Sequence, residues 1–369
     1  MANVFTKMGS YPEQDVTFLL KDLSAIKIEK STEERERSIQ GGAHYSEMLP
    51  IEYKPTASYM TLFYQSLEES KYKVAEAVAV VAEQIVKKRG FQTVLCSLAR
   101  AGTPIGVLIK RYIRKTYGLD LPHYSISIIR DRGIDENALH YMLKEHPGFE
   151  IAFIDGWTGK GAISKELQKA VIHFEESYGT RLSSELAVLA DPGYCTNVYG
   201  TREDFLIPSA CLNSTVSGLV SRTVLNNRWI EADDFHGAKY YEELLDEDVS
   251  NVYVDTIEEA FSQLGSNVQK KAESILTQGT PADWRGMTSI EAIGQEFHIE
   301  NTHLIKPGVG ETTRVLLRRI PWKILIQPGS QDQLKHILLL AEDRGVPVIE
   351  YANMSYTCCG LIRPMEQSS

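Results

Sequence analysis

The sequence of 369 residues has few cysteines and no long apolar run. Its five cysteines are odd in number and show none of the spacings that are typical of metal ligands. Adjacent cysteines such as Cys358 and Cys359 make an awkward disulfide, so we expect free thiols in a reducing compartment. No stretch approaches the roughly 20 apolar residues of a membrane span, and the N-terminus lacks a basic region followed by an apolar run. We therefore expect a cytoplasmic protein with no membrane contact.

Positive charge is also scarce, because 39 Lys and Arg stand against 49 Asp and Glu. The resulting net charge of −10 argues against a general coat for nucleic acid. The region from Asn301 onward is the exception, since 8 basic residues outnumber 6 acidic ones there and most of the excess lies between Lys306 and Lys323. This basic island could contact a polyanion, or it could be the solvated face of a helix.

The composition is that of a globular protein, with 43% apolar and 24% charged residues, and the length suits two or three domains. Strand-like and helix-like segments alternate through the middle of the chain, without an internal repeat or a low-complexity stretch. We expect helices from Ser58 to Gly90, after Pro104, at Glu136–Lys144 and at Lys165–Phe174, and strands at Phe91–Leu98, Tyr124–Ile129, Glu150–Ile154 and Glu185–Leu189. Such alternation predicts an α/β fold with a parallel sheet that helices cover.

Changes of pattern along the chain predict four parts. Residues 1–60 are irregular and could cover a site, and residues 61–245 hold the α/β pattern. Residues 246–298 are acidic and helical, so we expect a connector there. Residues 299–369 resume a small α/β pattern, with a strand–helix–strand segment at Lys323–Tyr351.

A glycine-rich turn follows the predicted strand Glu150–Ile154 and opens a helix. In an open parallel sheet, ligands bind beyond the carboxyl ends of the strands, where N–H groups at helix starts face outward and favour anions. The turn does not match the Walker A pattern, but its glycines let the backbone approach a phosphate group closely. Its candidate phosphate-binding residues are Asp155, Gly156, Thr158, Gly159, Lys160, Gly161 and Ser164.

A second turn with glycine, at Ser97–Gly106, follows the strand that ends at Leu98. An arginine and backbone N–H groups in it could face an anion, and two further arginines lie between the two turns, in Ile128–Ile134. Each turn alone is a weak signal, because glycine-rich connections between strands and helices are common. The candidate residues of the second turn are Ala99, Arg100, Ala101, Gly102 and Thr103.

Residues 151–164 resemble the loop of type I phosphoribosyltransferases that binds phosphoribosyl diphosphate (PRPP), where an apolar strand leads into acidic residues and a Gly/Thr-rich phosphate loop. Residues 97–106 resemble the diphosphate-binding loop of the same enzymes, and residues 128–134 stand in the place of their mobile loop. The order of the three segments also matches. The resemblance implies a type I phosphoribosyltransferase-like parallel sheet and an enzyme that transfers or releases the phosphoribosyl group of PRPP.

The same resemblance implies roles for individual residues. Asp155 would accept hydrogen bonds from ribose hydroxyls, and Arg130 and Arg132 would close over the departing diphosphate as further catalytic groups. Mg²⁺ would be the cofactor, held chiefly by the ligand and Asp155 without a dedicated protein site. These enzymes usually carry two adjacent acidic residues, whereas Gly156 follows Asp155 here. A non-catalytic PRPP sensor that regulates RNA is therefore the alternative.

Three polar segments could hold the acceptor of the phosphoribosyl group: Gly42–Glu47, Ala190–Cys195 and Pro208–Thr223. Each also has a purely structural explanation, because Pro-Gly turns and loops rich in hydroxyl groups often satisfy only the backbone. The candidate acceptor-binding residues are His44, Glu47, Asp191, Tyr194 and Asn213.

The segment Ile305–Arg314 resembles the RNA-contact segment of L7Ae/Pelota-type RNA-binding domains, in which a Gly, an Asn-Glu pair and a Thr-x-Lys stretch open a helix. The strand–helix–strand segment that follows also fits that fold. The resemblance implies a structured RNA as partner, whose phosphates the arginines would neutralise. The implied RNA-binding residues are Gly308, Gly310, Glu311, Thr313, Arg314 and Arg318.

A phosphoribosyltransferase-like core joined to a Pelota-like domain is similar to a bacterial family encoded in tellurite- and stress-resistance gene clusters, some members of which are labelled cysteine protease StiP. A protease would need a thiolate, a histidine and an orienting group within hydrogen-bond reach. Cys195 or Cys211 with His236 or His44 are the candidates, but no segment matches patterns such as C-G-[SA]-C-[WY]. We therefore expect a phosphoribosyltransferase with an RNA-binding module in a resistance system, with the cysteine protease as second alternative. The chain could also form a homo-oligomer.

Overall fold

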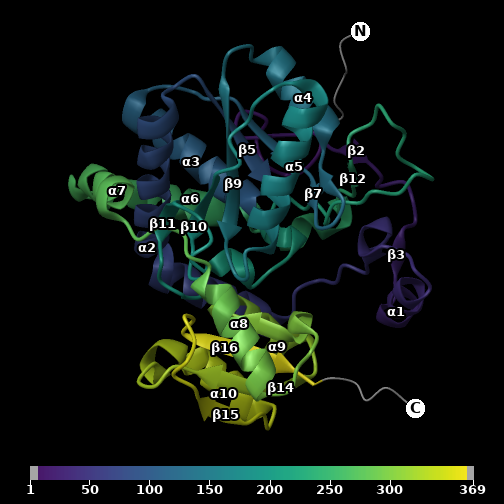
Figure 1. Cartoon of the computed structure of the whole chain (residues 1–369), viewed down its shortest axis with the longest axis vertical. Helices are drawn as coiled ribbons and strands as arrows, with labels where there is room; N and C mark the ends of the chain where they lie inside the picture. Colours follow the sequence, from purple (N-terminus) through teal and green to yellow (C-terminus); the bar gives the residue numbers. More distant parts are fainter. Residues whose placement is uncertain (1–6, 364–369) are drawn as a thin grey trace.

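Six parallel strands form the central sheet of the larger unit, in the order β1-β6-β5-β9-β10-β11 (Figure 1). The structure is a computed structural model that describes residues 7–363, apart from the side chains of Thr32, Glu36, Gln40 and Arg318. The strands are β1 Thr17–Phe18, β5 Thr93–Leu98, β6 His123–Ile126, β9 Glu150–Trp157, β10 Leu186–Ala190 and β11 Val198–Thr201. Strands β5 and β10 are buried along their whole length, as expected of a parallel sheet with both faces covered.

Helices cover the two faces of this sheet. On one face lie α2 (Ala57–Arg89) and α3 (Gly102–Tyr117), with α6 (Ser250–Ala260) packed on both and α7 (Asn267–Gln278) on α2. On the other face lie α4 (Glu136–Glu145) and α5 (Ala162–Tyr178). Residues 186–189 of β10 belong alternately to the two apolar clusters, because strand side chains alternate in direction.

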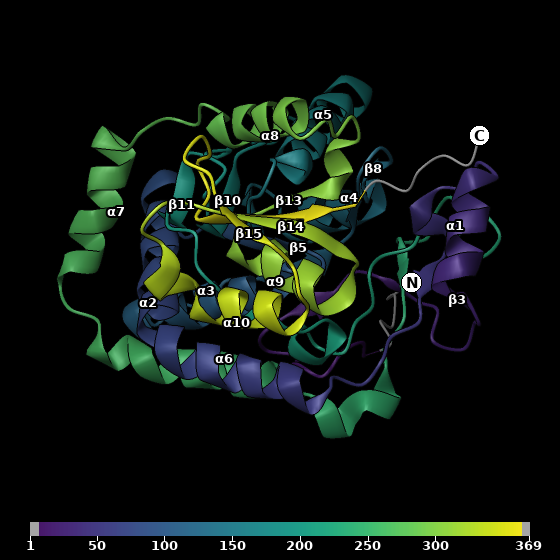
Figure 2. The same ribbon diagram turned by 90° about the horizontal axis from the view of Figure 1, so that it is seen from below.

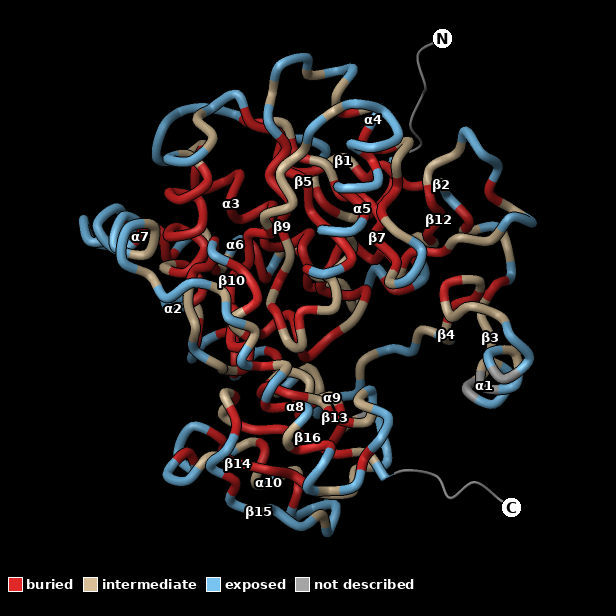
Figure 3. Tube along the Cα trace, in the orientation of Figure 1, coloured by how far each residue is buried: buried red, intermediate tan, exposed pale blue. Residues whose placement is uncertain are grey.

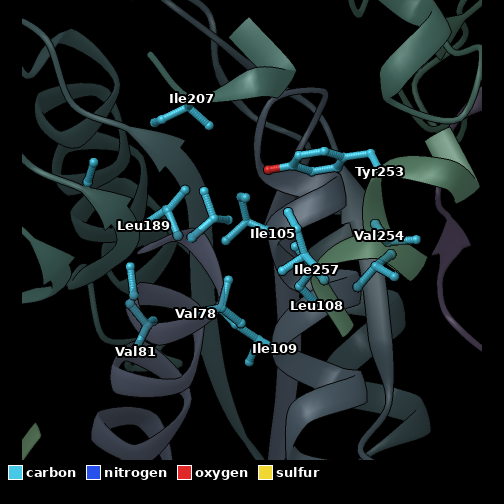
Figure 4. Close-up of a cluster of buried hydrophobic side chains, with 14 of the residues drawn as sticks. Val78, Val81, Ile105, Leu108, Ile109, Leu189, Ile207, Tyr253, Val254 and Ile257 are labelled. Carbon is cyan, nitrogen blue, oxygen red and sulfur yellow. The ribbon is translucent and has the colours of Figure 1, made fainter. Parts of the chain in front are cut away.

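The cluster beneath α2, α3 and α6 is the main core of the larger unit (Figure 4). Apolar side chains at helical spacing on each helix point into it and meet strand β10 and the loop after β11. Labelled members are Val78, Val81, Ile105, Leu108, Ile109, Leu189, Ile207, Tyr253, Val254 and Ile257. Figure 3 shows that the strands of the six-stranded sheet and β16 are largely buried, whereas β15 and α7 are mostly exposed.

A mixed sheet in the order β13-β16-β14-β15 forms the smaller, C-terminal unit. Its strands are β13 Ile305–Pro307, β14 Pro321–Ile326, β15 Val348–Glu350 and β16 Cys358–Ile362. Helices α8 (Arg285–Glu296), α9 (Val309–Arg318) and α10 (Lys335–Asp343) pack around it. We count α8 in this unit because Ile290 and Ile293 lie in one apolar cluster with Leu325 and Leu361 of the sheet.

Short elements complete the described chain. Three two-stranded ladders join β2 (Lys21–Asp22) to β12 (Gly237–Ala238), β3 (Glu29–Lys30) to β4 (Leu49–Pro50), and β7 (Ile128–Ile129) to β8 (Gly133–Ile134). Helix α1 (Thr32–Gln40) begins with a capping box in which Ser31 and Glu34 exchange hydrogen bonds.

The structure confirms the predicted α/β class, as a parallel sheet unit followed by a small mixed-sheet unit. One expected strand, Tyr124–Ile129, is divided between β6 in the main sheet and β7 in a separate ladder. Strand β9 runs to Trp157, so Asp155 lies inside the strand and not at its tip as expected. The limits of the four predicted parts stay predictions, and the last of them extends beyond the described residues.

Candidate functional site

The carboxyl ends of β9 and β10 meet the C-terminal unit, at a contact that we call the seam (Figure 1). The hydroxyl of Tyr356 donates a hydrogen bond to the carbonyl oxygen of Gly159 at 2.9 Å. The ammonium of Lys160 donates to the carbonyl oxygen of Thr302 at 2.6 Å. The glycine-rich turn after β9 therefore contacts both units.

The two turns predicted to bind phosphate groups lie side by side. A Cβ on Gly156 would be 3.2 Å from the carbonyl oxygen of Ala101, and one on Gly102 would be 3.1 Å from the Cα of Asp155. Glycine at both positions lets the turns approach this closely. The carboxylate of Asp155 accepts a hydrogen bond from the N–H of Gly156 at 2.7 Å, and burial raises the pKa of Asp155 to about 7.

The other polar residues of the second turn are used inside the fold. A guanidinium nitrogen of Arg100 lies 4.0 Å from the carboxylate of Glu52. The hydroxyl of Thr103 is hydrogen-bonded to that of Ser125 at 2.8 Å and is fully buried. The backbone N–H of Ala99 donates a hydrogen bond to the carbonyl oxygen of Ile126, at the end of β6, at 2.8 Å.

The predicted mobile loop contacts the N-terminal segment that was expected to cover a site. The N–H of Arg130 donates to the hydroxyl of Tyr45 at 3.0 Å, and the guanidinium of Arg130 lies 5.6 Å from the centre of the Tyr45 ring. Arg132 forms an ion pair with Glu47 at 3.2 Å. His44 begins the short 3₁₀ turn that carries Glu47, and burial lowers the pKa of His44.

Asp191, predicted as an acceptor residue, is the centre of a buried polar cluster at the end of β10. Its carboxylate accepts hydrogen bonds from the N–H groups of Cys195 at 2.9 Å and Thr196 at 3.1 Å, and it forms an ion pair with Arg202. The hydroxyl of Thr158 donates to Asp191 and lies close enough to the Cys195 thiol to influence its pKa, while Sγ of Cys195 donates to the carbonyl oxygen of Gly159 at 3.8 Å. Burial raises the pKa of Asp191. Thr158 thus links a thiol to a carboxylate.

Of the remaining acceptor candidates, Tyr194 borders this cluster, since its N–H donates to the carbonyl oxygen of Asp191 at 3.1 Å, and Asn213 lies in another loop. The ring of Tyr194 lies between two guanidinium groups, 4.3 Å from Arg202 and 3.9 Å from Arg285. The carbonyl oxygen of Asn213 accepts a hydrogen bond from the hydroxyl of Ser217 at 3.0 Å, in the loop before β12.

Cys195 lines a cavity of about 650 Å³ together with Ser164, Gln168 and Trp284. Its thiol lies at the N-terminus of α5, because a Cβ on Gly161, the residue before that helix, would be 2.8 Å from Sγ. Burial, followed by the charge of Asp191, raises the pKa of Cys195 to about 12. The thiol is therefore protonated in the resting protein, and only 4% of the residue is exposed.

The remaining cysteines have different surroundings. Cys96 lies within β5, and Cys358 and Cys359 lie within β16, all three fully buried. Cys211 lies under α2, with Sγ 3.8 Å from the hydroxyl of Ser66.

His236 and His44 were predicted to pair with a cysteine. Among residues 7–363, neither is one of the groups that interact with Cys195. His236 is hydrogen-bonded to Ser127 at 2.8 Å, and burial lowers the pKa of His236 to about 4. His44 is hydrogen-bonded to Ser46 at 2.8 Å.

Sequence reasoning missed two residues that shape this site, Trp284 and Lys165. The N–H of Trp284 donates to the carbonyl oxygen of Tyr194 at 3.0 Å, and the Trp284 ring packs against Gly161. The ammonium of Lys165 lies 5.1 Å from the centre of that ring. The one available signal was the Gly-Thr-Pro-Ala break at 279–282, which precedes the tryptophan.

The segment predicted to contact RNA faces the larger unit. Arg314 donates hydrogen bonds to the carbonyl oxygens of Ala210 at 2.9 Å and Leu212 at 3.2 Å. A Cβ on Gly310 would be 3.1 Å from the Cβ of Ala210. Gly308 and Thr313 are buried, Glu311 pairs with Arg314 at 3.5 Å, and the side chain of Arg318 lies outside the described residues.

Among residues 7–363, no group of three or more His, Cys, Asp or Glu side chains is placed to hold a metal ion. Within the same residues, none of the helices combines the length and the apolar character that crossing a membrane requires. The predicted Mg²⁺ and the predicted cytoplasmic location stay predictions.

These features define a class of two-unit α/β proteins, with a cysteine cavity beside a parallel sheet and a mixed-sheet unit that contacts the carboxyl ends of β9 and β10. Residues 9–258 match the family model described as tellurite-like stress resistance cysteine protease StiP, and residues 284–364 match the model of the PELOTA RNA binding domain. The protein named cysteine protease StiP from Acinetobacter baylyi is 36% identical over 350 residues, which are 92% of this chain and 89% of that protein. The chain belongs to the StiP family of tellurite-like stress resistance proteins, and its C-terminal unit is Pelota-like.

The family match corrects the predicted activity. The expected phosphoribosyltransferase activity is wrong, because the matching family and relative are described as cysteine proteases. The physical reason is that a glycine-rich turn between a strand and a helix is needed wherever the two pack closely, whatever the chemistry of the site. The recognition of a tellurite- and stress-resistance family with a Pelota-like domain is confirmed. PRPP, RNA and a second copy of the chain as partners stay predictions.

Proposed function

We propose that this protein is a cysteine protease in which Cys195 is the nucleophile. The observation that carries the proposal is the position of Cys195 on the wall of a cavity of about 650 Å³, in a chain whose family is described by that activity. A peptide needs such a cavity to bring a carbonyl carbon to the thiol. Cys96, Cys358 and Cys359 are enclosed in strands and offer no such approach.

The link through Thr158 supplies a route for the thiol proton. The Cys195 thiol passes its proton to the hydroxyl oxygen of Thr158, whose own proton passes to the carboxylate of Asp191. Burial makes Asp191 a stronger base than an exposed aspartate, because it raises the pKa of that carboxyl. The N-terminus of α5 and the ammonium of Lys165 stabilise the thiolate that remains.

The thiolate then attacks the peptide carbonyl carbon, and an acyl-thioester forms as the C–N bond breaks. The departing amine takes the proton back from Asp191 through Thr158. Water hydrolyses the thioester, which releases the carboxylic acid and restores the thiol. In the resting protein Cys195 is 4% exposed, so Trp284 has to move before a peptide can reach Sγ.

The test measures the hydrolysis of a mixture of fluorogenic peptides by two full-length variants, Cys195→Ala and Cys211→Ala. We expect hydrolysis to fall to background in the first variant and to persist in the second. Circular dichroism serves to confirm that both variants fold. Hydrolysis that survives in Cys195→Ala would refute the assignment, and its loss in Cys211→Ala alone would move the nucleophile to Cys211.

We further infer that the Pelota-like unit binds RNA. The match of residues 284–364 to the PELOTA RNA binding domain supports this, together with the cations Lys306, Arg314 and Lys323 of that unit. A salt titration of binding to a kinked RNA hairpin tests it, since phosphate contacts weaken steeply with salt. Binding that is absent at low salt would contradict the inference. The finer likeness of the sheet to type I phosphoribosyltransferases remains a prediction without support from the comparisons.

A further inference from the structure

Two side chains of the C-terminal unit, Trp284 and Tyr356, enclose the thiol of Cys195. A Cβ on Gly161 would be 2.8 Å from Sγ of Cys195 and would also touch the Trp284 ring, so the ring and the thiol pack on the same glycine. The carbonyl oxygen of Gly159 accepts hydrogen bonds from Sγ of Cys195 at 3.8 Å and from the hydroxyl of Tyr356 at 2.9 Å. Tyr356 is fully buried, and 4% of Cys195 is exposed. The C-terminal unit in its docked position therefore covers the thiol.

The cations that support RNA binding by the C-terminal unit lie at the same seam. Arg314 donates hydrogen bonds to the carbonyl oxygens of Ala210 at 2.9 Å and Leu212 at 3.2 Å, both in the larger unit. Lys306 is half-buried and lines a small cavity opposite the turn that follows β9. Both cations thus face the larger unit. An RNA backbone can contact them fully only when the seam opens.

The C-terminal unit is packed as one body, so its parts move together. Figure 2 shows its sheet between α8 on one side and α9 and α10 on the other. Ile290 of α8, Leu325 of β14 and Tyr356 share one apolar cluster, and α9 packs against β16. Residues 279–283, which join α7 to α8, belong to no helix or strand, and none of them is buried. This segment serves as a hinge, and a displacement of α9 carries Trp284 and Tyr356 with it.

Trp284 has a strained backbone in the docked position. Its φ of 59° lies in the left-handed region, which a bulky side chain rarely adopts. Contacts with the turn that carries Cys195 hold it there. The N–H of Trp284 donates to the carbonyl oxygen of Tyr194 at 3.0 Å, and the N–H of Gly286 donates to that of Gly193 at 3.2 Å. Strain of this kind persists only while the surroundings enforce it, so opening of the seam relieves it.

We propose that the docked C-terminal unit autoinhibits Cys195 and that binding of a structured RNA to this unit releases the inhibition. One docking contact hides both the thiol and the cations, so the RNA-binding state and the state with an open cysteine cavity are the same. RNA binds the open state more tightly and therefore shifts the population toward it. Its backbone phosphates pair with Lys306 and Arg314. This inference rests on the proposed function and adds the regulation of its site.

The experiment measures alkylation of Cys195 by iodoacetamide in the full chain, mapped by mass spectrometry, with and without a saturating concentration of a kinked RNA hairpin. We expect the hairpin to speed alkylation about tenfold, an ordinary size for the coupling between two sites. Cys96 is the internal control, because it is enclosed in β5 and only unfolding would expose it. It should stay unmodified under both conditions.

Three variants separate docking from RNA contact. Asp204→Ala removes the acceptor that holds the start of α9, so its Cys195 should react about tenfold faster without RNA and gain little from the hairpin. Lys306→Met should lose most of the response at a hairpin concentration that half-saturates the original chain. Lys335→Met is the matched control, because this lysine is 79% exposed on the same unit, and it should respond as the original chain does.

Peptide hydrolysis, measured in parallel, distinguishes failure of this inference from failure of the proposed protease. Alkylation that RNA accelerates, in a chain that hydrolyses no peptide, would refute the protease and support the coupling. A hairpin that binds the original chain without changing the alkylation of Cys195 would overturn the coupling, whatever the rate of hydrolysis. Absence of hairpin binding to both the original chain and Asp204→Ala would overturn it as well, and so would equal acceleration at Cys96.

Discussion

The carboxylate of Asp204, in the larger unit, accepts a hydrogen bond from the backbone N–H of Val309 at 2.8 Å, where α9 of the C-terminal unit begins. The other oxygen of the same carboxylate accepts from the N–H of Thr357, also at 2.8 Å. Asp204 is thus an N-terminal cap for α9 that comes from a different unit. This half-buried carboxylate therefore joins the two units at the seam, together with the contacts of Tyr356, Lys160 and Arg314.

We predict that Asp204→Ala loosens the C-terminal unit. Two backbone N–H groups would lose their acceptor, and each buried unsatisfied group costs about 1–3 kcal/mol of unfolding free energy. Urea unfolding and limited proteolysis at the seam measure the effect. Asp332→Ala is the control, since Asp332 is exposed and 3.7 Å from Lys335, in a kind of pair worth little. Equal resistance of Asp204→Ala and the original chain to proteolysis would contradict the role of Asp204.

The same variant should bind RNA more tightly. Arg314 and the start of α9 face Ala210 and Leu212, so their release exposes the segment that resembles an RNA-contact surface. We expect an increase of severalfold in affinity for a kinked hairpin, measured by fluorescence anisotropy at fixed salt. Arg314→Met in the Asp204→Ala background should remove the gain. If Asp204→Ala and the original chain bind alike, RNA does not use this face.

Asp191→Asn should separate thiol reactivity from catalysis. The charge of Asp191 contributes to the raised pKa of Cys195, so its removal lowers that pKa and speeds alkylation by iodoacetamide at pH 8. Peptide hydrolysis should nevertheless fall by a hundredfold or more, because the proton acceptor is lost. Slower alkylation together with normal hydrolysis would be incompatible with the proposed proton route.

Trp284→Ala should expose the thiol. The Trp284 ring packs beside Gly161 and lines the cavity of Cys195, so its removal opens the path of a peptide to Sγ. We expect mass spectrometry to show alkylation of Cys195 that is about tenfold faster. Steady-state kinetics should show a lower KM for peptides. Trp322→Ala, which changes a tryptophan on the core of the C-terminal unit, is the control. Unchanged alkylation in Trp284→Ala would show that another element covers the cysteine.

Stability should depend on pH through Lys160. Its pKa in the folded protein, about 8, lies below the ordinary value of 10.5, because burial and the charge of Lys306 disfavour the ammonium. The unfolded chain therefore binds an extra proton between pH 8 and 10.5, so the free energy of unfolding should rise over this range. Urea unfolding at a series of pH values measures the trend, which should vanish in Lys160→Met; an equal rise in that variant would argue against a role for this lysine.

Much of the fold was predictable from local pattern. Helix α2 carries apolar residues at helical spacing and is capped by Gly90, and β5 is a short, mainly apolar strand that is buried along its whole length. Strand β1, two residues long, has too little sequence to give a pattern and exists because it pairs with β6. The break between β6 and β7 arises from pairing of β7 with β8, which no local signal indicates.

The candidate site was predictable only in part. Asp191 and Thr158 were both singled out, but for different ligands, because their link depends on β9 and β10 being neighbours with Trp157 opposite Ala190. The order of strands in a parallel sheet is a property of the tertiary structure, and the spacing of residues in the sequence does not determine it. The packing of Trp284 against Gly161, beside Cys195, could not be predicted for the same reason, because Trp284 follows Cys195 by more than 80 residues in the sequence.

The central claim is that Cys195 attacks the peptide carbonyl carbon, and covalent trapping tests it most directly. The full chain is incubated with peptides that carry an electrophilic carbonyl at the cleaved position, and the adduct is mapped by mass spectrometry. The account predicts one adduct, on Cys195, which forms more slowly in Thr158→Val and is absent in Cys195→Ser. An adduct on Cys211, or none on any cysteine while peptides are still hydrolysed, would contradict it.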